Sequence, residues 1–109
     1  MTRPIRSPDL MVKFALTEHT IEGALKQVRS GYRPLYDVRP DFWSSVHHEF
    51  VDTDSMTTGE QSFAEVWLLS PEAYPQTFWI GRQLKVAEGA RVIGTAEVLQ
   101  ILNPSLRMD

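Results

Sequence analysis

The sequence contains no cysteine and no long hydrophobic run, and each absence excludes a class of protein. Without cysteine there is no disulfide scaffold, no thiolate zinc site and no cysteine nucleophile. No apolar run approaches the roughly 18 residues that a membrane-spanning helix needs. The basic residues Arg3 and Arg6 are followed by no apolar segment, so no secretory signal is indicated. We therefore expect a cytoplasmic protein that makes no contact with a membrane.

Motifs for nucleotide binding and for catalysis are also missing. The phosphate-binding run G-x-x-x-x-G-K-[ST] does not occur, so we expect no bound nucleotide. No G-x-S-x-G run occurs, although Ser44, Ser45 and His47 lie close together in the sequence. Closeness in sequence is not catalytic geometry. We expect a protein that is not an enzyme and carries no cofactor.

Acidic residues slightly outnumber basic ones, and the net charge is −3. Proteins that bind nucleic acid usually have a basic surplus, because phosphate contacts supply much of their affinity. The charge balance therefore disfavours RNA as a partner, unless one face of the fold gathers the basic residues. A protein partner is the expectation that fits the composition better.

One group of metal-ligand residue types occurs, at His47, His48, Glu49, Asp52 and Asp54. On a strand His47 and Glu49 would share a face, so a metal could use both together with Asp52. The alternative is a solvated acidic loop after a strand. We favour the loop and assign no metal.

Period-two alternation of apolar residues is the main structural signal in the chain. Val12, Phe14 and Leu16 fall on one face of a predicted strand over residues 11–16. Similar patterns predict strands at residues 35–38, 42–52 (as one strand or two), 62–69, 83–87 and 91–102. Residues 52–60 are polar and predict a loop. Gly94, inside the last strand, indicates a bulge or a bend.

Residues 17–30 allow two interpretations. Ile21, Ala24, Leu25 and Val28 have the spacing of a short amphipathic helix near residues 20–29. Gly23 is unfavourable inside a helix, and two turns of helix are marginal by themselves. The segment is therefore either a short helix or an irregular loop.

These elements predict one all-β domain. We expect a small closed antiparallel β-barrel of about six strands with a Greek-key-like topology. A closed barrel leaves no exposed strand edge, which favours closure over an open sandwich. We assign residues 1–10 to a flexible N-terminal tail, residues 11–103 to the barrel and residues 104–109 to a C-terminal tail.

Three segments together resemble the third, C-terminal domain of elongation factor Tu. They are Ser30-Gly31-Tyr32-Arg33-Pro34, Ala64-Glu65-Val66-Trp67-Leu68-Leu69-Ser70-Pro71, and the run from Leu84 to Gly94 that reads LKVAEGARVIG. The order and approximate spacing of the segments agree with that domain over about residues 11–102. The resemblance implies a β-barrel without the GTPase domain. It also implies a role connected with translation, with a protein partner or, alternatively, the acceptor and T-stem of tRNA.

Four residues are the candidate binding residues: Tyr32, Arg33, Trp67 and Arg91. Trp67 lies opposite the Val66 and Leu68 face of its strand, so it either meets a partner or is covered by the 17–30 segment. Arg33 and Arg91 could bind a carboxylate or a phosphate. For Arg33 we favour a structural ion pair with Asp37 or Asp41. The leading hypothesis is a non-enzymatic module that binds a protein, for example as an antagonist or immunity protein. RNA binding and a small-molecule or metal site at the barrel mouth are the alternatives.

Overall fold

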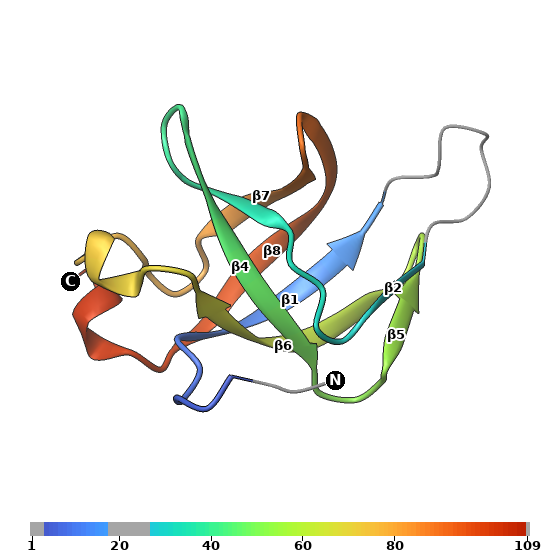
Figure 1. Ribbon diagram of the computed structural model, residues 1–109, viewed down its shortest axis with the longest axis horizontal. Helices are drawn as coiled ribbons and strands as arrows, with labels where there is room; N and C mark the ends of the chain where they lie inside the picture. Colours follow the sequence, from blue (N-terminus) through green and yellow to red (C-terminus); the bar gives the residue numbers. More distant parts are fainter. Residues whose placement is uncertain (1–3, 18–26, 109) are drawn as a thin grey trace.

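The computed structural model describes residues 4–17 and 27–108, which form mainly β-strands (Figure 1). The strands are β1 (Leu10–Leu16), β2 (Gln27–Arg29), β3 (Leu35–Arg39), β4 (Phe42–Phe50), β5 (Ser55–Thr57), β6 (Gln61–Leu68), β7 (Gln83–Glu88) and β8 (Arg91–Ile101). Two short 3-10 helices are η1 (Pro71–Ala73) and η2 (Pro104–Leu106). Among the described residues there is no helix with the length and apolar character needed to cross a membrane.

Six strands close into an antiparallel barrel in the order β1-β6-β4-β3-β7-β8. Closure comes from β1, which pairs with β6 on one side and with β8 on the other. The closed all-β barrel predicted from the sequence is thus confirmed. Because every barrel strand has two neighbours, its backbone hydrogen-bonding groups find partners within the sheet.

The alternating strands bury the faces that their patterns predict. Val12, Phe14 and Leu16 of β1 are fully buried, and so is Ala64 of β6. Inside the barrel the rings of Phe14 and Phe50 are stacked, with centroids 6.2 Å apart. The interior is therefore a packed core of side chains.

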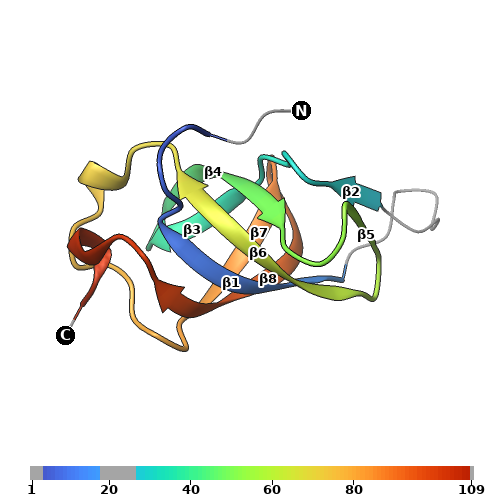
Figure 2. The same cartoon turned by 90° about the horizontal axis from the view of Figure 1, so that it is seen from below.

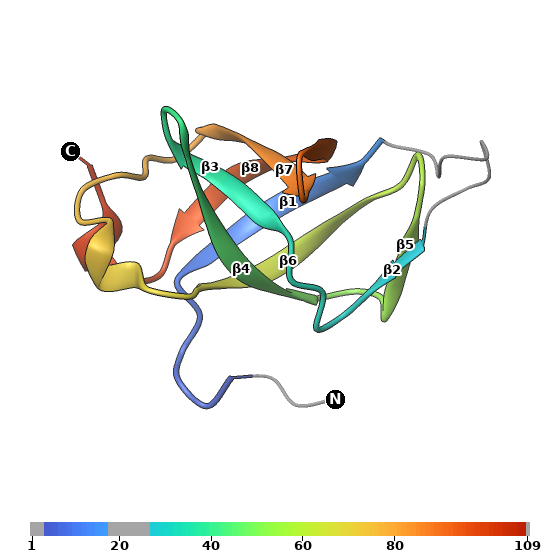
Figure 3. The ribbon, with the colours of Figure 1, turned by 45° about the horizontal axis from the view of Figure 1, so that its top comes forward.

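The polar segment 52–60, predicted as a loop, contains the strand β5. Its central residue Met56 is almost fully buried, and β5 pairs with β2 through Val28 opposite Met56. A single apolar residue between polar neighbours gives too short an alternation to read from sequence. The predicted helix near residues 20–29 is wrong over residues 27–29, which are β2, and its remaining residues lie outside the described part. Figure 3 shows β2 and β5 as a small ribbon at one end of the barrel.

Gly94 marks the bulge that its position in β8 predicts. Val86 pairs with Gly94 and Ala87 pairs with Val92, so Ile93 is an extra residue in the ladder. A Cβ atom added at Gly94 would lie 2.2 Å from the carbonyl oxygen of Ala15. Glycine is therefore needed here to let β1 and β8 approach closely.

Both segments assigned to tails are held against the barrel where the structure describes them. The backbone N–H of Asp9 donates to Val66, and its buried carboxylate accepts from the backbone N–H of Leu68 at 2.8 Å. At the other end of the chain Leu106 is fully buried, and its carbonyl accepts from Phe78. The boundaries at residues 10 and 104 therefore do not separate free tails from the barrel. Figures 1 and 2 show η1 and η2 together at the end of the barrel opposite β2 and β5.

Candidate functional site

A groove on the outside of the barrel brings together two of the four candidate binding residues, Arg33 and Trp67. We call it the Trp67 groove, and its volume is about 340 Å³. The lining residues are Pro4, Arg6, Arg33, Ser45, Val46, His47, Trp67, Leu68 and Leu69. They come from the N-terminal segment, the segment before β3, β4, and the end of β6. No Asp or Glu is among them.

The sheet register explains how these residues meet. His47 of β4 lies directly opposite Trp67 of β6, and their ring centroids are 5.7 Å apart. The backbone of Tyr32 and Pro34 accepts hydrogen bonds from β4, which places Arg33 beside β4 on the side away from β6. Arg33, His47 and Trp67 therefore lie in one row across three neighbouring backbone segments.

Trp67, the strongest candidate from the sequence, is buried rather than displayed. Its side chain is covered by the N-terminal segment, because the indole Nε1–H donates to the carbonyl oxygen of Arg6 at 2.7 Å. Arg6 itself donates to the carbonyl of Leu68 at 2.5 Å and to the Asp9 carboxylate at 2.9 Å. Figure 2 shows this N-terminal segment passing beside β6. The hydrogen bond from Trp67 to Arg6 therefore attaches the N-terminal segment to the barrel beside the groove.

His47 adds a polar group to the groove floor. Its Nε2 lies 2.5 Å from the Glu49 carboxylate, so Nε2 carries the proton of this hydrogen bond. Its Nδ1 is buried and has no hydrogen-bond partner among the described residues. The interaction with Glu49 fixes the ring in place against Trp67.

Arg33 is exposed, and its guanidinium pairs with no described residue. The ion pair with Asp37 or Asp41 that the sequence favoured is therefore wrong. Asp37 instead accepts a hydrogen bond from the backbone N–H of Lys85 at 2.7 Å. The Asp37 carboxylate is therefore engaged with β7.

Tyr32 and Arg91 lie away from the groove. The Tyr32 ring packs on Phe14, and its hydroxyl hydrogen-bonds to the Glu88 carboxylate. Burial, and to a lesser degree this carboxylate, raises the pKa of Tyr32. Arg91 lies opposite Glu88 in the ladder at the hairpin between β7 and β8. Tyr32 therefore acts as a bridge between the junction before β3 and this hairpin.

Two groove residues were missed by the sequence reasoning. Leu69 has 76% of its surface exposed, and it continues the outward face that Trp67 shares, so strand alternation could have found it. Arg6 lies in a segment without periodicity, and nothing in the sequence places it beside Leu68. Trp43 and Trp79 are the exposed tryptophans, at 41% and 46%, and neither lines the groove.

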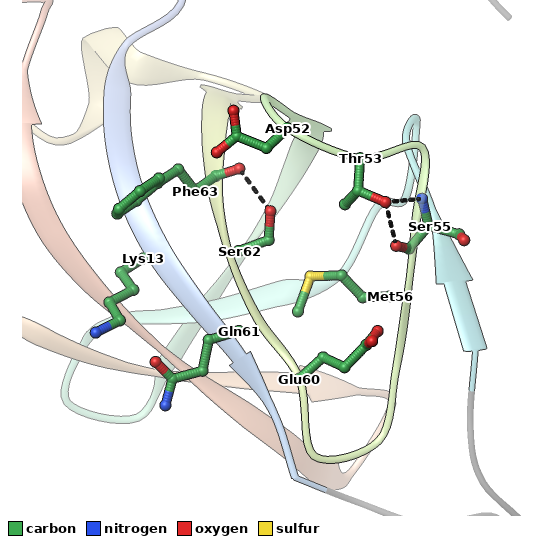
Figure 4. A pocket seen from close by; sticks show the side chains of 9 residues that line it. All are labelled: Lys13, Asp52, Thr53, Ser55, Met56, Glu60, Gln61, Ser62 and Phe63. Atoms are coloured by element: carbon green, nitrogen blue, oxygen red, sulfur yellow. Dashed lines mark hydrogen bonds between the residues drawn. The ribbon is translucent and has the colours of Figure 1, made fainter.

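A second, larger hollow of about 490 Å³ lies near Phe63, outside the barrel (Figure 4). It is lined by Lys13, Asp52, Thr53, Ser55, Met56, Glu60, Gln61, Ser62 and Phe63. The Ser62 hydroxyl donates to the carbonyl of Phe63, and the Thr53 hydroxyl donates to that of Ser55. Within the described part of the chain no histidine lines the hollow to activate either hydroxyl, and none of the candidate binding residues is present. We therefore base the functional argument on the Trp67 groove.

Neither metal chemistry nor sequence comparison adds a further site. Among residues 4–17 and 27–108 there is no group of three or more His, Asp or Glu side chains placed to hold a metal ion. No protein-family model and no curated protein matches the chain. The functional argument therefore rests on the geometry and charge of the groove.

Proposed function

We propose that this protein is a non-enzymatic, cytoplasmic binding module that holds a protein partner in the Trp67 groove. The observation that carries the proposal is the juxtaposition of Arg33, which pairs with no described residue, and the exposed side chain of Leu69 in one groove. Hydrophobic residues beside an accessible guanidinium are typical of protein-binding surfaces, where arginine is enriched.

The architecture supports a relationship to the third domain of elongation factor Tu. The closed six-stranded antiparallel barrel has the fold class that this resemblance implies. On this basis the partner belongs to translation, and the protein acts on it as an accessory module, an antagonist or an immunity protein. The groove includes Arg33 from the Gly-Tyr-Arg-Pro segment and Trp67 from the second matching segment, so two parts of the resemblance meet at the proposed site.

The chemistry of the groove favours a protein over RNA. Among the described residues two guanidinium groups line it, from Arg6 and Arg33, and Arg6 already bonds to Asp9 and Leu68. Two residues away from His47 and Trp67 along the same two strands, Glu49 of β4 lies opposite Glu65 of β6. These carboxylates would repel a phosphate backbone that continued beyond the groove.

Affinity capture from a cell lysate tests the proposal. The immobilised protein is compared with Leu69→Asp, which puts a charge on the apolar part of the groove, and with Val92→Asp as a matched control. Val92 is 44% exposed on β8 and does not line the groove. We expect a discrete protein to remain bound at moderate salt to the wild type and to Val92→Asp, and to be lost with Leu69→Asp.

Two results would contradict the proposal. One is that no specific protein is retained, and the other is that Leu69→Asp retains the same proteins as the wild type. Nucleic acid in the eluate is measured in the same experiment. Capture of tRNA at low salt that disappears at moderate salt would favour the RNA-binding alternative.

A further inference from the structure

We infer that the occupant of the Trp67 groove is a short, acidic protein segment, with a carboxylate at Arg33 and an apolar side chain beside Leu69. This inference rests on the proposed function and specifies the chemistry of the partner. It is argued from the charge of the lining, the exposure of its apolar residue and the volume of the groove.

Charge is the first argument. The whole chain is acidic, with a net charge of −3, yet the described residues that line the groove include two arginines and no acidic residue. The Arg33 guanidinium makes no hydrogen bond or ion pair with a described residue. Arg6 uses two donors on Asp9 and Leu68, and a guanidinium has five. A carboxylate is the protein group that matches this fork of donors.

The apolar part of the groove is the second argument. Leu69 follows β6 directly, and its backbone N–H bonds to the carbonyl of Ser45, so its position is fixed by the sheet. Pro4 and Trp67 also line the groove, although only 3% of the Trp67 surface is exposed. An aliphatic or aromatic side chain on the partner would remove part of the Leu69 side chain from water, which is favourable in proportion to the apolar area buried.

The volume of the groove limits the part of the partner that it can hold. About 340 Å³ is enough for a few side chains, so the occupant is a short segment of the partner.

The acidic residues around the groove set the direction of the segment. Glu49 and Glu65 lie opposite each other on the same outer face, two residues along their strands from His47 and Trp67. The Glu49 carboxylate is engaged with His47, and Glu65 also has an interaction partner. Their charge disfavours acidic groups at that end, so the carboxylate of the partner belongs at the arginine and Leu69 end.

Peptide display with the purified full-length protein tests the inference. A library of random twelve-residue peptides is selected separately on the wild type, on Arg33→Glu and on Arg29→Glu. Arg29 is an exposed arginine of β2 that does not line the groove, so it is the matched charge-reversal control. We expect Asp or Glu next to an aliphatic or aromatic residue in peptides from the wild type and Arg29→Glu, and loss of this pattern with Arg33→Glu.

Binding of one selected peptide is then measured by fluorescence anisotropy. Arg33→Glu is expected to weaken it by about tenfold or more, since a hydrogen-bonded charge pair becomes a like-charge contact. Changing the acidic residue of the peptide to Lys should restore much of the affinity for Arg33→Glu and weaken binding to the wild type. Failure of this charge exchange would overturn the inference.

The outcomes separate the inference from the proposed function. Selected peptides that are neutral or basic, and that lose binding to Leu69→Asp, would overturn the acidic occupant and keep the protein-binding groove. Selected peptides that bind Arg33→Glu and Leu69→Asp with the same affinity as the wild type would contradict both the acidic occupant and the protein-binding groove. A single-stranded RNA probe that displaces the peptides and depends on Arg33 would replace the peptide with RNA. A library that yields no binder would also overturn the inference.

Discussion

His48 is a fully buried histidine in the barrel interior, and it predicts how stability changes with pH. Its Nε2 lies 2.6 Å from the Tyr36 hydroxyl, and its Nδ1 has no hydrogen-bond partner among the described residues. The ring of Phe14 meets it edge-on at 4.9 Å. Burial, with a smaller contribution from neighbouring His47, lowers the pKa of His48 to about 3. The folded protein therefore keeps this imidazole neutral.

The direction and size of the effect follow from the difference between the two states. In the unfolded chain the pKa of His48 is about 6.5, so below that pH the unfolded state binds more protons than the folded state. Stability is then constant above about pH 7 and falls as the pH decreases from about 6.5 toward 3. Between pH 7 and pH 5 the loss of unfolding free energy is about 2 kcal/mol. This is a substantial part of the 5–15 kcal/mol that is typical of a domain.

Urea unfolding at pH 7, 6 and 5 measures this loss. The wild type is compared with His48→Gln, which cannot be protonated in this range and can still hydrogen-bond to Tyr36. We expect His48→Gln to lose about 2 kcal/mol less than the wild type between pH 7 and pH 5.

A second variant protects the test against a folding failure. His48→Phe combined with Tyr36→Phe removes both polar partners, and replacing both can be nearly neutral for stability. It should show the same reduced pH dependence as His48→Gln. If both variants lose as much stability as the wild type between pH 7 and pH 5, the assignment of the pH dependence to His48 is wrong.

Two further changes test how the barrel and its N-terminal segment are held together. Gly94→Ala should lower the unfolding free energy by about 1–3 kcal/mol, because its Cβ would meet the carbonyl of Ala15. Exposed Thr95→Ala should change it by no more than about 0.5 kcal/mol, and equal stability of the two variants in urea would refute the close approach. Asp9→Ala should cost about 1–3 kcal/mol, because the buried N–H of Leu68 loses its acceptor. Asp9→Asn keeps an acceptor oxygen and should cost less in the same urea experiment, and a larger cost for Asn than for Ala would contradict this explanation.

The positive charge of the groove comes from two arginines, Arg6 and Arg33, which lie on different segments of the chain. Arg33 points from a junction whose backbone is bonded to β4, whereas Arg6 lies in a segment held by Asp9. The two guanidiniums therefore reach the same groove from segments that are far apart in sequence. An acidic peptide would bridge them, and the peptide and charge-exchange experiments address that arrangement directly.

The sequence by itself determined the barrel. Alternation at Val12, Phe14 and Leu16, and again at Ala64 and Val66, predicted strands and their buried faces, and the structure confirms both. This worked because a strand places successive side chains on opposite faces, so burial on one face leaves a period of two in the sequence. The alternation of apolar and polar residues was less informative for β5, because Met56 is its only apolar residue.

The tertiary structure alone decided the site. The sequence left Trp67 open between contact with a partner and cover by residues 17–30, and it favoured an ion pair of Arg33 with Asp37 or Asp41. The structure buries Trp67 beneath the N-terminal segment and shows no ion pair between Arg33 and either aspartate. Trp67 is covered because Arg6, some sixty residues earlier, supplies a carbonyl for its indole N–H. Such contacts depend on how distant segments pack in space, and no short-range periodicity records them. Local alternation could specify the strands, whereas the groove exists only where the closed barrel brings its segments together.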